Sequence, residues 1–163
     1  MRHGLLAGCA ALGFGVANAA ALPKPDFELS DGRRFVRLSE LPAKPTVVNF
    51  WRADCPPCVR ELPLLAALAR EGKVRVVTVA LQRQAETMAA PTGVQTALHP
   101  PLLSLHGPGE PRGLLARFGN PVGALPHTVW LGTDGRVCAR KTGEIDAAWL
   151  AAQQGRCGQT EGE

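Results

Sequence analysis

Two cysteines three positions apart, Cys55 and Cys58, are the residues of this chain whose types and spacing most clearly point to chemistry. An apolar segment of strand length, residues 46–51, precedes them, and an amphipathic helix is expected over residues 56–71. The thiolate is the reactive form of cysteine, and a helix N-terminus stabilises negative charge. Cys55 is therefore the expected attacking thiol of a disulfide that opens and closes, and Cys58 is the expected resolving thiol.

The same C-x-x-C spacing also occurs in zinc sites and in purely structural disulfides. A zinc site needs a second close pair of cysteines or nearby histidines, and Cys138 and Cys157 lie far apart in the sequence. Two prolines, Pro56 and Pro57, separate the reactive pair and suit the first turn of a helix, which argues against a merely structural bridge. No metal site and no cofactor are expected. A module that binds Cu(I) through the two soft sulfur atoms stays open as an alternative.

Composition and charge restrict the class of protein. The 163 residues suffice for one domain with a core, and a hydrophobic fraction of 45% with a charged fraction of 20% is typical of a globular protein. The net charge of +4 is not gathered into a stripe of Lys and Arg interleaved with aromatic residues. No nucleic-acid partner is therefore expected.

The N-terminus has the composition of a targeting segment. Residues 1–19 read as a signal peptide, with Arg2 in a short positive region, an apolar stretch, and Ala17-Asn18-Ala19 as the cleavage signal. An uncleaved membrane anchor and a lipoprotein leader with Cys9 as the lipidated residue are the alternatives. All three place the domain in the periplasm or otherwise outside the cytoplasm, either free or attached to a membrane at its N-terminus.

Export to an oxidising compartment changes how the cysteines are interpreted. Without the leader, Cys55, Cys58, Cys138 and Cys157 remain, an even number that permits three pairings. The close pair is the candidate redox disulfide, which leaves Cys138 and Cys157 for a structural disulfide.

The order of elements predicts an α/β fold, with a mixed central sheet flanked by helices and an N-terminal β-hairpin extension. Residues 20–26 are expected to be a linker, 27–157 the domain and 158–163 a disordered tail. Residues 82–111 carry little periodicity and predict one helix, near 82–89. The other predicted elements are a hairpin of strands 27–29 and 33–38, strand 46–51, helix 56–71, strand 74–81, helix 112–118, strands 127–131 and 136–141, and a helix over 147–154 that Asp146 caps and Gly155 ends.

From Asp26 to Gln154 the chain resembles the TlpA/ResA-type extracytoplasmic thioredoxin-like thiol–disulfide oxidoreductases. The resemblance is carried by five motifs, which are Asn49-Phe50-Trp51, Cys55-Pro56-Pro57-Cys58, Glu61-Leu62-Pro63, Leu125-Pro126-His127-Thr128 and Asp134-Gly135-Arg136. It implies the thioredoxin fold and protein thiols and disulfides as substrates. It further implies a DsbD- or CcdA-like membrane electron donor, and apocytochrome c or a copper-site protein as the client.

The resemblance also implies roles for individual residues. A cis Leu125–Pro126 bond is expected beside the cysteines, where its backbone binds extended thiol substrates. Trp51 is placed with these substrate-binding residues and is expected to pack under the cysteines. Glu61, one turn after Cys58, is expected to shuttle protons, whereas His127 is expected to be a packing or surface histidine.

One departure from the family pattern bears on reactivity. Asp54 stands where relatives have tryptophan before the first cysteine, and its carboxylate is expected to raise the pKa of Cys55. The sequence therefore predicts an exported oxidoreductase that works mainly as a reductase. A disulfide-forming oxidase or isomerase is the alternative within redox enzymes, and the Cu(I) module is the alternative outside them.

Overall fold

A seven-stranded mixed sheet forms the centre of the fold, in a computed structural model that describes residues 24–157. The strand order is β2-β1-β5-β4-β3-β6-β7. The predicted leader, most of the predicted linker and the predicted tail lie outside the described residues. The elements are β1 Glu28–Ser30, β2 Phe35–Arg37, a 3-10 turn η1 Leu38–Glu40, β3 Thr46–Trp51, α1 Pro56–Arg70, β4 Arg75–Ala80, α2 Gln84–Met88, α3 Thr92–Ala97, β5 Leu103–His106, α4 Arg112–Arg117, β6 His127–Leu131, β7 Val137–Thr142 and α5 Ala147–Cys157.

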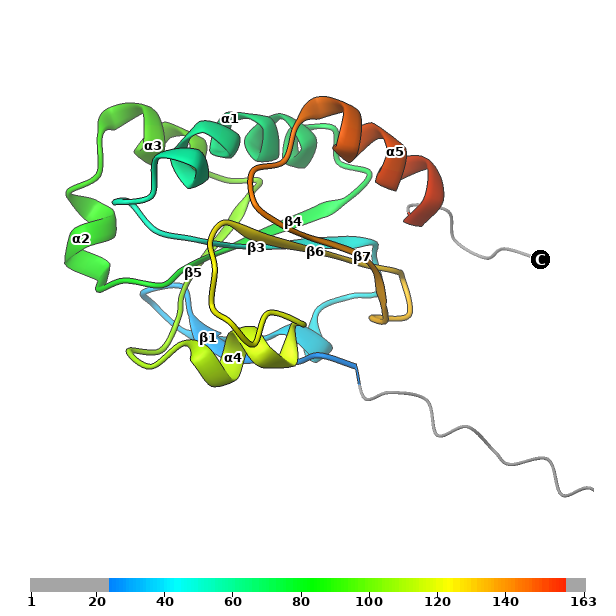
Figure 1. The fold of residues 1–163 in the computed structure, drawn as a ribbon, viewed down its shortest axis with the longest axis horizontal. Helices are drawn as coiled ribbons and strands as arrows, with labels where there is room; N and C mark the ends of the chain where they lie inside the picture. Colours follow the sequence, from blue (N-terminus) through cyan, green and yellow to red (C-terminus); the bar gives the residue numbers. More distant parts are fainter. Residues whose placement is uncertain (1–23, 158–163) are drawn as a thin grey trace, which may run out of the picture.

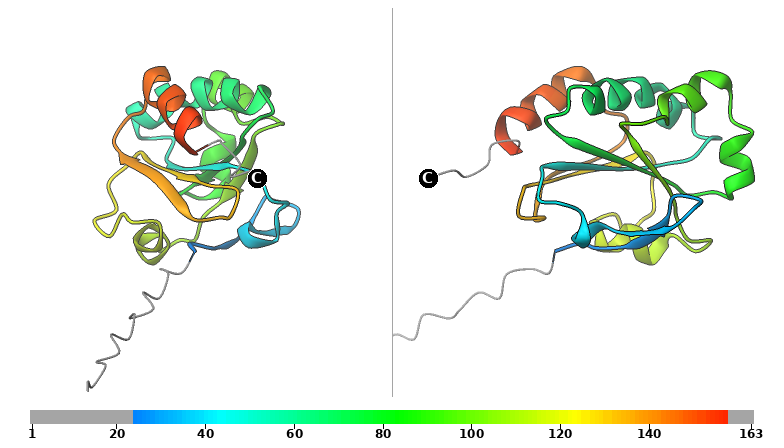
Figure 2. Two further views of the ribbon diagram at one scale, coloured as in Figure 1. Left: turned by 90° about the vertical axis from the view of Figure 1, so that its right-hand side faces the viewer. Right: turned by 180° about the vertical axis from the view of Figure 1, so that it is seen from behind.

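Three parallel strands, β3, β4 and β5, occupy the middle of the sheet, and the flanking strands are antiparallel to their neighbours. Helices α1, α3 and α5 cover one face of the sheet, whereas α4 covers the other (Figure 1). The views in Figure 2 place the N-terminal hairpin on the α4 side as well. This is the predicted thioredoxin-like architecture with a β-hairpin extension.

Residues of β3 alternate between two cores. Val47 and Trp51 face the core under α1 and α5, and Val48 and Phe50 face the core that contains α4 and the hairpin. Both sets are fully buried, as expected for a central strand whose two faces are covered. The strand therefore brings the chain to the cysteines on a rigid support.

The segment 82–111 holds more regular structure than predicted. The expected helix near 82–89 is present as α2, but α3 and the strand β5 were not predicted. β5 has four residues, partly buried except for Leu105, and it is held by pairing with β4 on one side and β1 on the other. Such pairing between distant segments leaves little trace in local periodicity.

The last helix is longer than predicted. Asp146 caps it as expected, because the backbone N–H of Trp149 donates to Asp146 Oδ1 at 2.7 Å. The helix does not end at Gly155 but continues to Cys157. Glycine inside a helix costs about 1 kcal/mol, and burial of Cys157 against Cys138 offsets that cost. Within residues 24–157, no helix has the length and apolar character needed to cross a bilayer.

Candidate active site

The Cys55–Cys58 pair lies at the N-terminus of α1 as a disulfide, with the two Cα atoms 5.3 Å apart. Cys55 is the N-cap residue, and its Sγ accepts a hydrogen bond from the backbone N–H of Cys58 at 3.3 Å. Pro56 and Pro57 fill the first helical positions, where a missing N–H breaks no helical hydrogen bond. Cys55 is partly exposed and Cys58 is fully buried, so only the first sulfur is within reach of another protein.

Glu61 lies in the core one turn after Cys58 and is fully buried. Its Oε1 accepts a hydrogen bond from Asn49 Nδ2 at 2.6 Å, and its Oε2 accepts one from the backbone N–H of Ile145 at 3.0 Å. Asn49 Nδ2 also donates to Thr128 Oγ1 at 3.0 Å. The carboxyl group is thus held between β3, β6 and the segment before α5.

Burial raises the pKa of Glu61 to about 7, and the hydrogen bonds from Ile145 and Asn49 only partly oppose that effect. A carboxyl group with such a pKa exchanges a proton near neutral pH. The resemblance pointed to Glu61, but it assigned no role to Thr128 or Ile145. The backbone N–H of Ile145 leaves no sequence signal, whereas Thr128 lies in the motif that follows Pro126.

The segment that supplies Ile145 is itself tied to the helix of the cysteines. Arg60 on α1 donates two hydrogen bonds to Glu144, at 3.0 and 2.6 Å. This ion pair is largely exposed, so its contribution to stability is small. Its effect is local, because it holds the residue next to Ile145 against the exposed side of α1.

We expect Glu61 to make stability fall with rising pH. The folded protein holds this proton up to about pH 7, whereas the unfolded chain releases it near pH 4.5, so unfolding becomes easier over that interval. The shift corresponds to about 3 kcal/mol in the free energy of unfolding. Glu61→Gln, which cannot ionise, should remove this slope in urea titrations between pH 4.5 and 8, whatever its effect on absolute stability.

The control for this prediction is Glu71→Gln, which changes an exposed glutamate at the other end of α1 and should retain the slope of the unmodified protein. Parallel pH profiles for Glu61→Gln and the unmodified protein would show that Glu61 has the same pKa in the folded and unfolded states, which would contradict the prediction.

The Leu125–Pro126 peptide bond is cis, as the resemblance implies. Register places the following residue, His127, opposite Phe50, so Pro126 enters β6 beside the end of β3 that leads to the cysteines. Pro126 is buried and Leu125 is partly exposed. The buried side chain of Asn120 organises the preceding loop, because its Nδ2 donates to Ala124 O at 2.7 Å and its Oδ1 accepts from Gly123 N at 3.1 Å.

His127 is a packing residue. It is fully buried, and its two ring nitrogens lie 2.9 Å from Thr142 Oγ1 and 3.0 Å from Phe118 O. A carbonyl can only accept, so Nε2 carries the proton and Nδ1 accepts from Thr142. Burial lowers the pKa of His127, which keeps the ring neutral.

Trp51 does pack in the core that contains Cys58, but its assignment to the substrate-binding residues needs correction. Its side chain is 0% exposed, so no client can touch it without unfolding the strand. The strand β3 is covered on both faces, so the indole does not reach the surface. Trp51 supports the pair from beneath.

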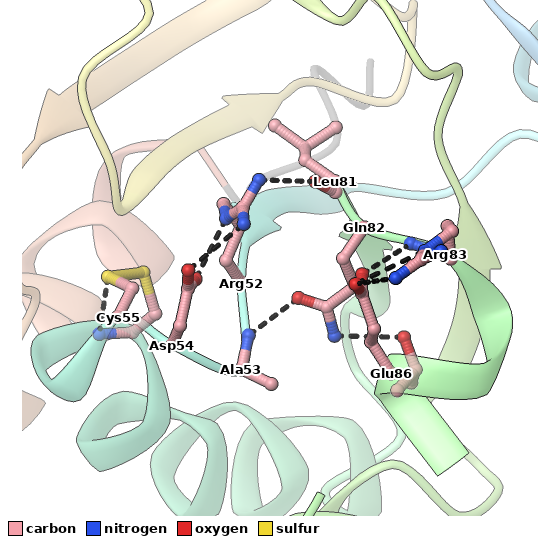
Figure 3. Close-up of polar contacts among 10 residues, drawn as sticks. Arg52, Ala53, Asp54, Cys55, Leu81, Gln82, Arg83 and Glu86 are labelled. Atoms are coloured by element: carbon pink, nitrogen blue, oxygen red, sulfur yellow. Dashed lines mark hydrogen bonds and ion pairs between the residues drawn. A yellow bond between two sulfur atoms is a disulfide. The ribbon is translucent and has the colours of Figure 1, made fainter. Parts of the chain in front are cut away.

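The environment of Asp54 also differs from the expectation. Arg52 donates to both carboxylate oxygens of Asp54, at 2.8 and 3.0 Å (Figure 3). These hydrogen bonds lower the pKa of Asp54 and raise that of Arg52. The prediction that Asp54 raises the pKa of Cys55 treated the carboxylate as an isolated charge, and the guanidinium offsets that charge.

A polar groove of about 480 Å³ adjoins the active-site loop on the β4 side. Its walls come from the segments that follow β3, β4 and β5, which is the edge where α/β sheets usually bind ligands. The lining residues include Arg52, Gln82, Arg83, Glu86 and His106. Within the described residues, no three potential metal ligands of the types His, Cys, Asp or Glu cluster together.

The other two cysteines within residues 24–157, Cys138 on β7 and Cys157 at the end of α5, form a second disulfide with Cα atoms 5.8 Å apart. It joins the last strand to the last helix, on the face that α1 also covers (Figure 1). Cys157 is buried, so this disulfide is less accessible to another protein than the partly exposed Cys55.

Comparison with known proteins agrees with this geometry. Residues 19–150 match the family model described as Redoxin. No sequence match was found among curated proteins. Among solved structures, a protein from Chlorobium tepidum assigned as thiol:disulfide interchange protein DsbE is 22% identical, with a TM-score of 0.65 over 80% of this chain and 90% of its own.

Two mycobacterial structures are similar as well. DsbF of MTB is 22% identical, with a TM-score of 0.64 over 80% of this chain and 93% of its own. A secreted disulfide oxidoreductase of Mycobacterium tuberculosis, homologous to E. coli DsbE, is 20% identical, with a TM-score of 0.60 over 80% and 95% of the two chains. At these identities the structures show a shared fold. The family match covers most of the sequence, and the chain therefore belongs to the Redoxin family, with a thioredoxin-like fold.

Proposed function

We propose that this protein is an exported reductase that opens disulfides in client proteins. The observation that carries the proposal is the placement of the two sulfurs at the mouth of α1, with Cys55 partly exposed and Cys58 buried behind it. An exposed sulfur at a helix N-terminus can attack, and a buried one can only resolve.

In the first step the Cys55 thiolate attacks one sulfur of the client disulfide. A bond forms between Cys55 and that sulfur, the client S–S bond breaks, and the other client sulfur leaves as a thiolate that takes up a proton. In the second step the Cys58 thiolate attacks Cys55 Sγ, which releases the first client sulfur and forms the Cys55–Cys58 disulfide. The client gains two electrons and two protons, and the protein loses them.

Glu61 and Pro126 have supporting roles in this mechanism. The buried Glu61 carboxylate takes the proton from Cys58 as that thiol becomes nucleophilic, which its pKa of about 7 allows near neutral pH. The backbone at Leu125 and Pro126, beside the end of β3, offers a place for an extended client segment next to Cys55. Both roles rest on the geometry described above together with the family resemblance.

The redox direction follows from the reduction potential of the Cys55–Cys58 couple. At a thioredoxin-like potential of about −270 mV, oxidation by a DsbA-like couple at about −120 mV releases roughly 7 kcal/mol. A reductase in such a compartment needs continual reduction, and we assign this to a DsbD- or CcdA-like membrane donor. Equilibration with a glutathione or dithiothreitol buffer measures the potential. A value near −120 mV would favour the oxidase or isomerase alternative.

Clients are expected to accumulate on a variant that cannot resolve. Cys58→Ser blocks the second step, so Cys55 should retain its client as a mixed disulfide that thiol reductants release. Mass spectrometry of the trapped species should identify apocytochrome c or a copper-site protein. The double variant Cys55→Ser/Cys58→Ser is the control and should trap neither. Recovery of other proteins alone would remove the assigned client classes, and tight Cu(I) binding without insulin reduction would favour the copper module.

A further inference from the structure

Arg52 and Asp54 form a charged pair directly beside the attacking cysteine. Arg52 Nε lies 2.8 Å from Asp54 Oδ1, and Arg52 Nη2 lies 3.0 Å from Asp54 Oδ2, so the guanidinium and the carboxylate meet through two parallel hydrogen bonds. This geometry is the most specific that an arginine and a carboxylate can form. The side chains are 44% and 68% exposed, so the pair stands at the surface that a client would approach.

The rest of the loop fixes the position of this pair. Arg52 Nη1 donates to Leu81 O at 3.2 Å, which anchors the guanidinium to the chain just after β4. The backbone N–H of Ala53 donates to Gln82 Oε1 at 2.6 Å, and Gln82 Nε2 donates to Thr87 Oγ1 at 2.9 Å. Figure 3 shows Arg52 between Asp54 and Leu81, next to the disulfide. Both residues that precede Asp54 are therefore tied to the segment that follows β4.

The electrostatic consequence concerns the thiolate. A lone carboxylate on the residue before Cys55 would oppose the favourable charge at the start of α1 and disfavour the thiolate. An equal positive charge held against that carboxylate cancels most of its field. Among the exposed charged groups of the neighbouring segments, Arg83 is paired with Glu86 on α2, and Arg60 with Glu144. The buried Glu61 also ionises near neutral pH, but it is present in every variant compared below. Arg52 is thus the group whose removal would leave Asp54 uncompensated next to the sulfur.

We propose that Arg52 is a positioning residue for the reaction, which holds Asp54 in a neutral pair and thereby preserves the thiolate of Cys55 at the helix N-terminus. The inference rests on the proposed function in so far as Cys55 is the attacking thiol. It assigns a joint role to two side chains in the active-site loop. It predicts that replacing Arg52 and replacing Asp54 shift the pKa of Cys55 in opposite directions.

The test measures the pKa of Cys55 in a Cys58→Ser background, from the pH dependence of its alkylation by iodoacetamide, with mass spectrometry of the peptide that carries Cys55. Arg52→Gln should raise this pKa by roughly half a unit to one unit, and Asp54→Asn should lower it by a similar amount. The double variant should return close to the value of the parent. The single-variant shifts should shrink as salt is added, because both charges are exposed.

Arg136→Gln is the matched control, because Arg136 and Asp134 form an arginine–aspartate pair with the same sequence spacing at the opposite end of the sheet. It should leave the pKa of Cys55 unchanged. Arg52→Lys keeps the charge without the double hydrogen bond and should rescue most of the shift. If Arg52→Gln unfolds the protein, Asp54→Asn still decides the proposal by the sign of its shift.

Shifts of the same sign in both single variants, or no shift in either, would overturn the inference and indicate a merely structural loop contact. Failure of the proposed function has a different signature. In that case proteins that retain both cysteines would not reduce insulin, whichever residue stands at position 52 or 54, while the alkylation profiles would still decide whether the pair acts on Cys55.

Discussion

Replacing Cys55 with serine is expected to abolish disulfide reduction, with a loss on the order of a thousandfold or more in the insulin turbidity assay. The serine hydroxyl stays protonated and does not form a stable bond to sulfur, so the first step cannot occur. The fold should persist, because serine is a favoured N-cap residue and its oxygen can accept the Cys58 N–H bond that Cys55 Sγ accepts. Circular dichroism of the same preparation provides the check on folding.

Activity that survives in Cys55→Ser at more than a few per cent of the parent would show that Cys58 can attack a client directly. That result would contradict the burial of Cys58, which has no exposed surface in the oxidised protein. A comparison with Cys58→Ser, which should retain single-step reaction with a client, separates the loss of attack from the loss of resolution.

The second large effect concerns stability. Removing the other disulfide with Cys138→Ala/Cys157→Ala is expected to lower the free energy of unfolding by about 3 kcal/mol, because a crosslink over a sequence separation of 19 restricts the unfolded chain by roughly that amount. The midpoint of thermal unfolding should fall by roughly 10 °C. The measurement is urea titration of both proteins, made once with the Cys55–Cys58 pair oxidised and once with it reduced.

Insulin reduction at a temperature where both proteins are folded should be unchanged in Cys138→Ala/Cys157→Ala, since this bridge joins β7 to α5 and the active site lies at the start of α1. A loss of stability below 1 kcal/mol would mean that the unfolded chain gains little freedom when the bridge is absent. A matching loss of reductase activity would instead assign the second disulfide to electron transfer.

Much of the site could be read from local sequence, because it follows from one strand-to-helix junction. Three local features predicted where the sulfurs lie and that Cys55 is the more exposed of the two. They are the apolar run up to Trp51, the two prolines and the helical spacing after Cys58. Glu61 and Pro126 required the family resemblance, since a glutamate on a helix and a proline before a strand are common features by themselves. Their burial depends on the pairing of β3 with β6, which no local pattern reveals.

Other features were not predicted from the sequence because they depend on contacts between distant segments. The strand β5 has only four residues and lies in a stretch rich in proline, so its identity depends on β4 and β1. The partner of Asp54 lies two positions away, but its geometry depends on the carbonyl of Leu81. The helix α5 passes Gly155 because Cys157 is bonded to Cys138, a constraint that overrides the usual effect of glycine.

The N-terminal hairpin has a consequence for association between copies of this chain. Because β1 covers β5, the outermost strand on that side is β2, which has three residues and carries Arg37 in ion pairs with Glu28 and Glu40. The opposite border, β7, carries Arg140 and Lys141 and has a register irregularity against β6. Short, charged or irregular borders are poor templates for intermolecular β-pairing, so both outer strands of the described sheet disfavour aggregation through edge-to-edge pairing.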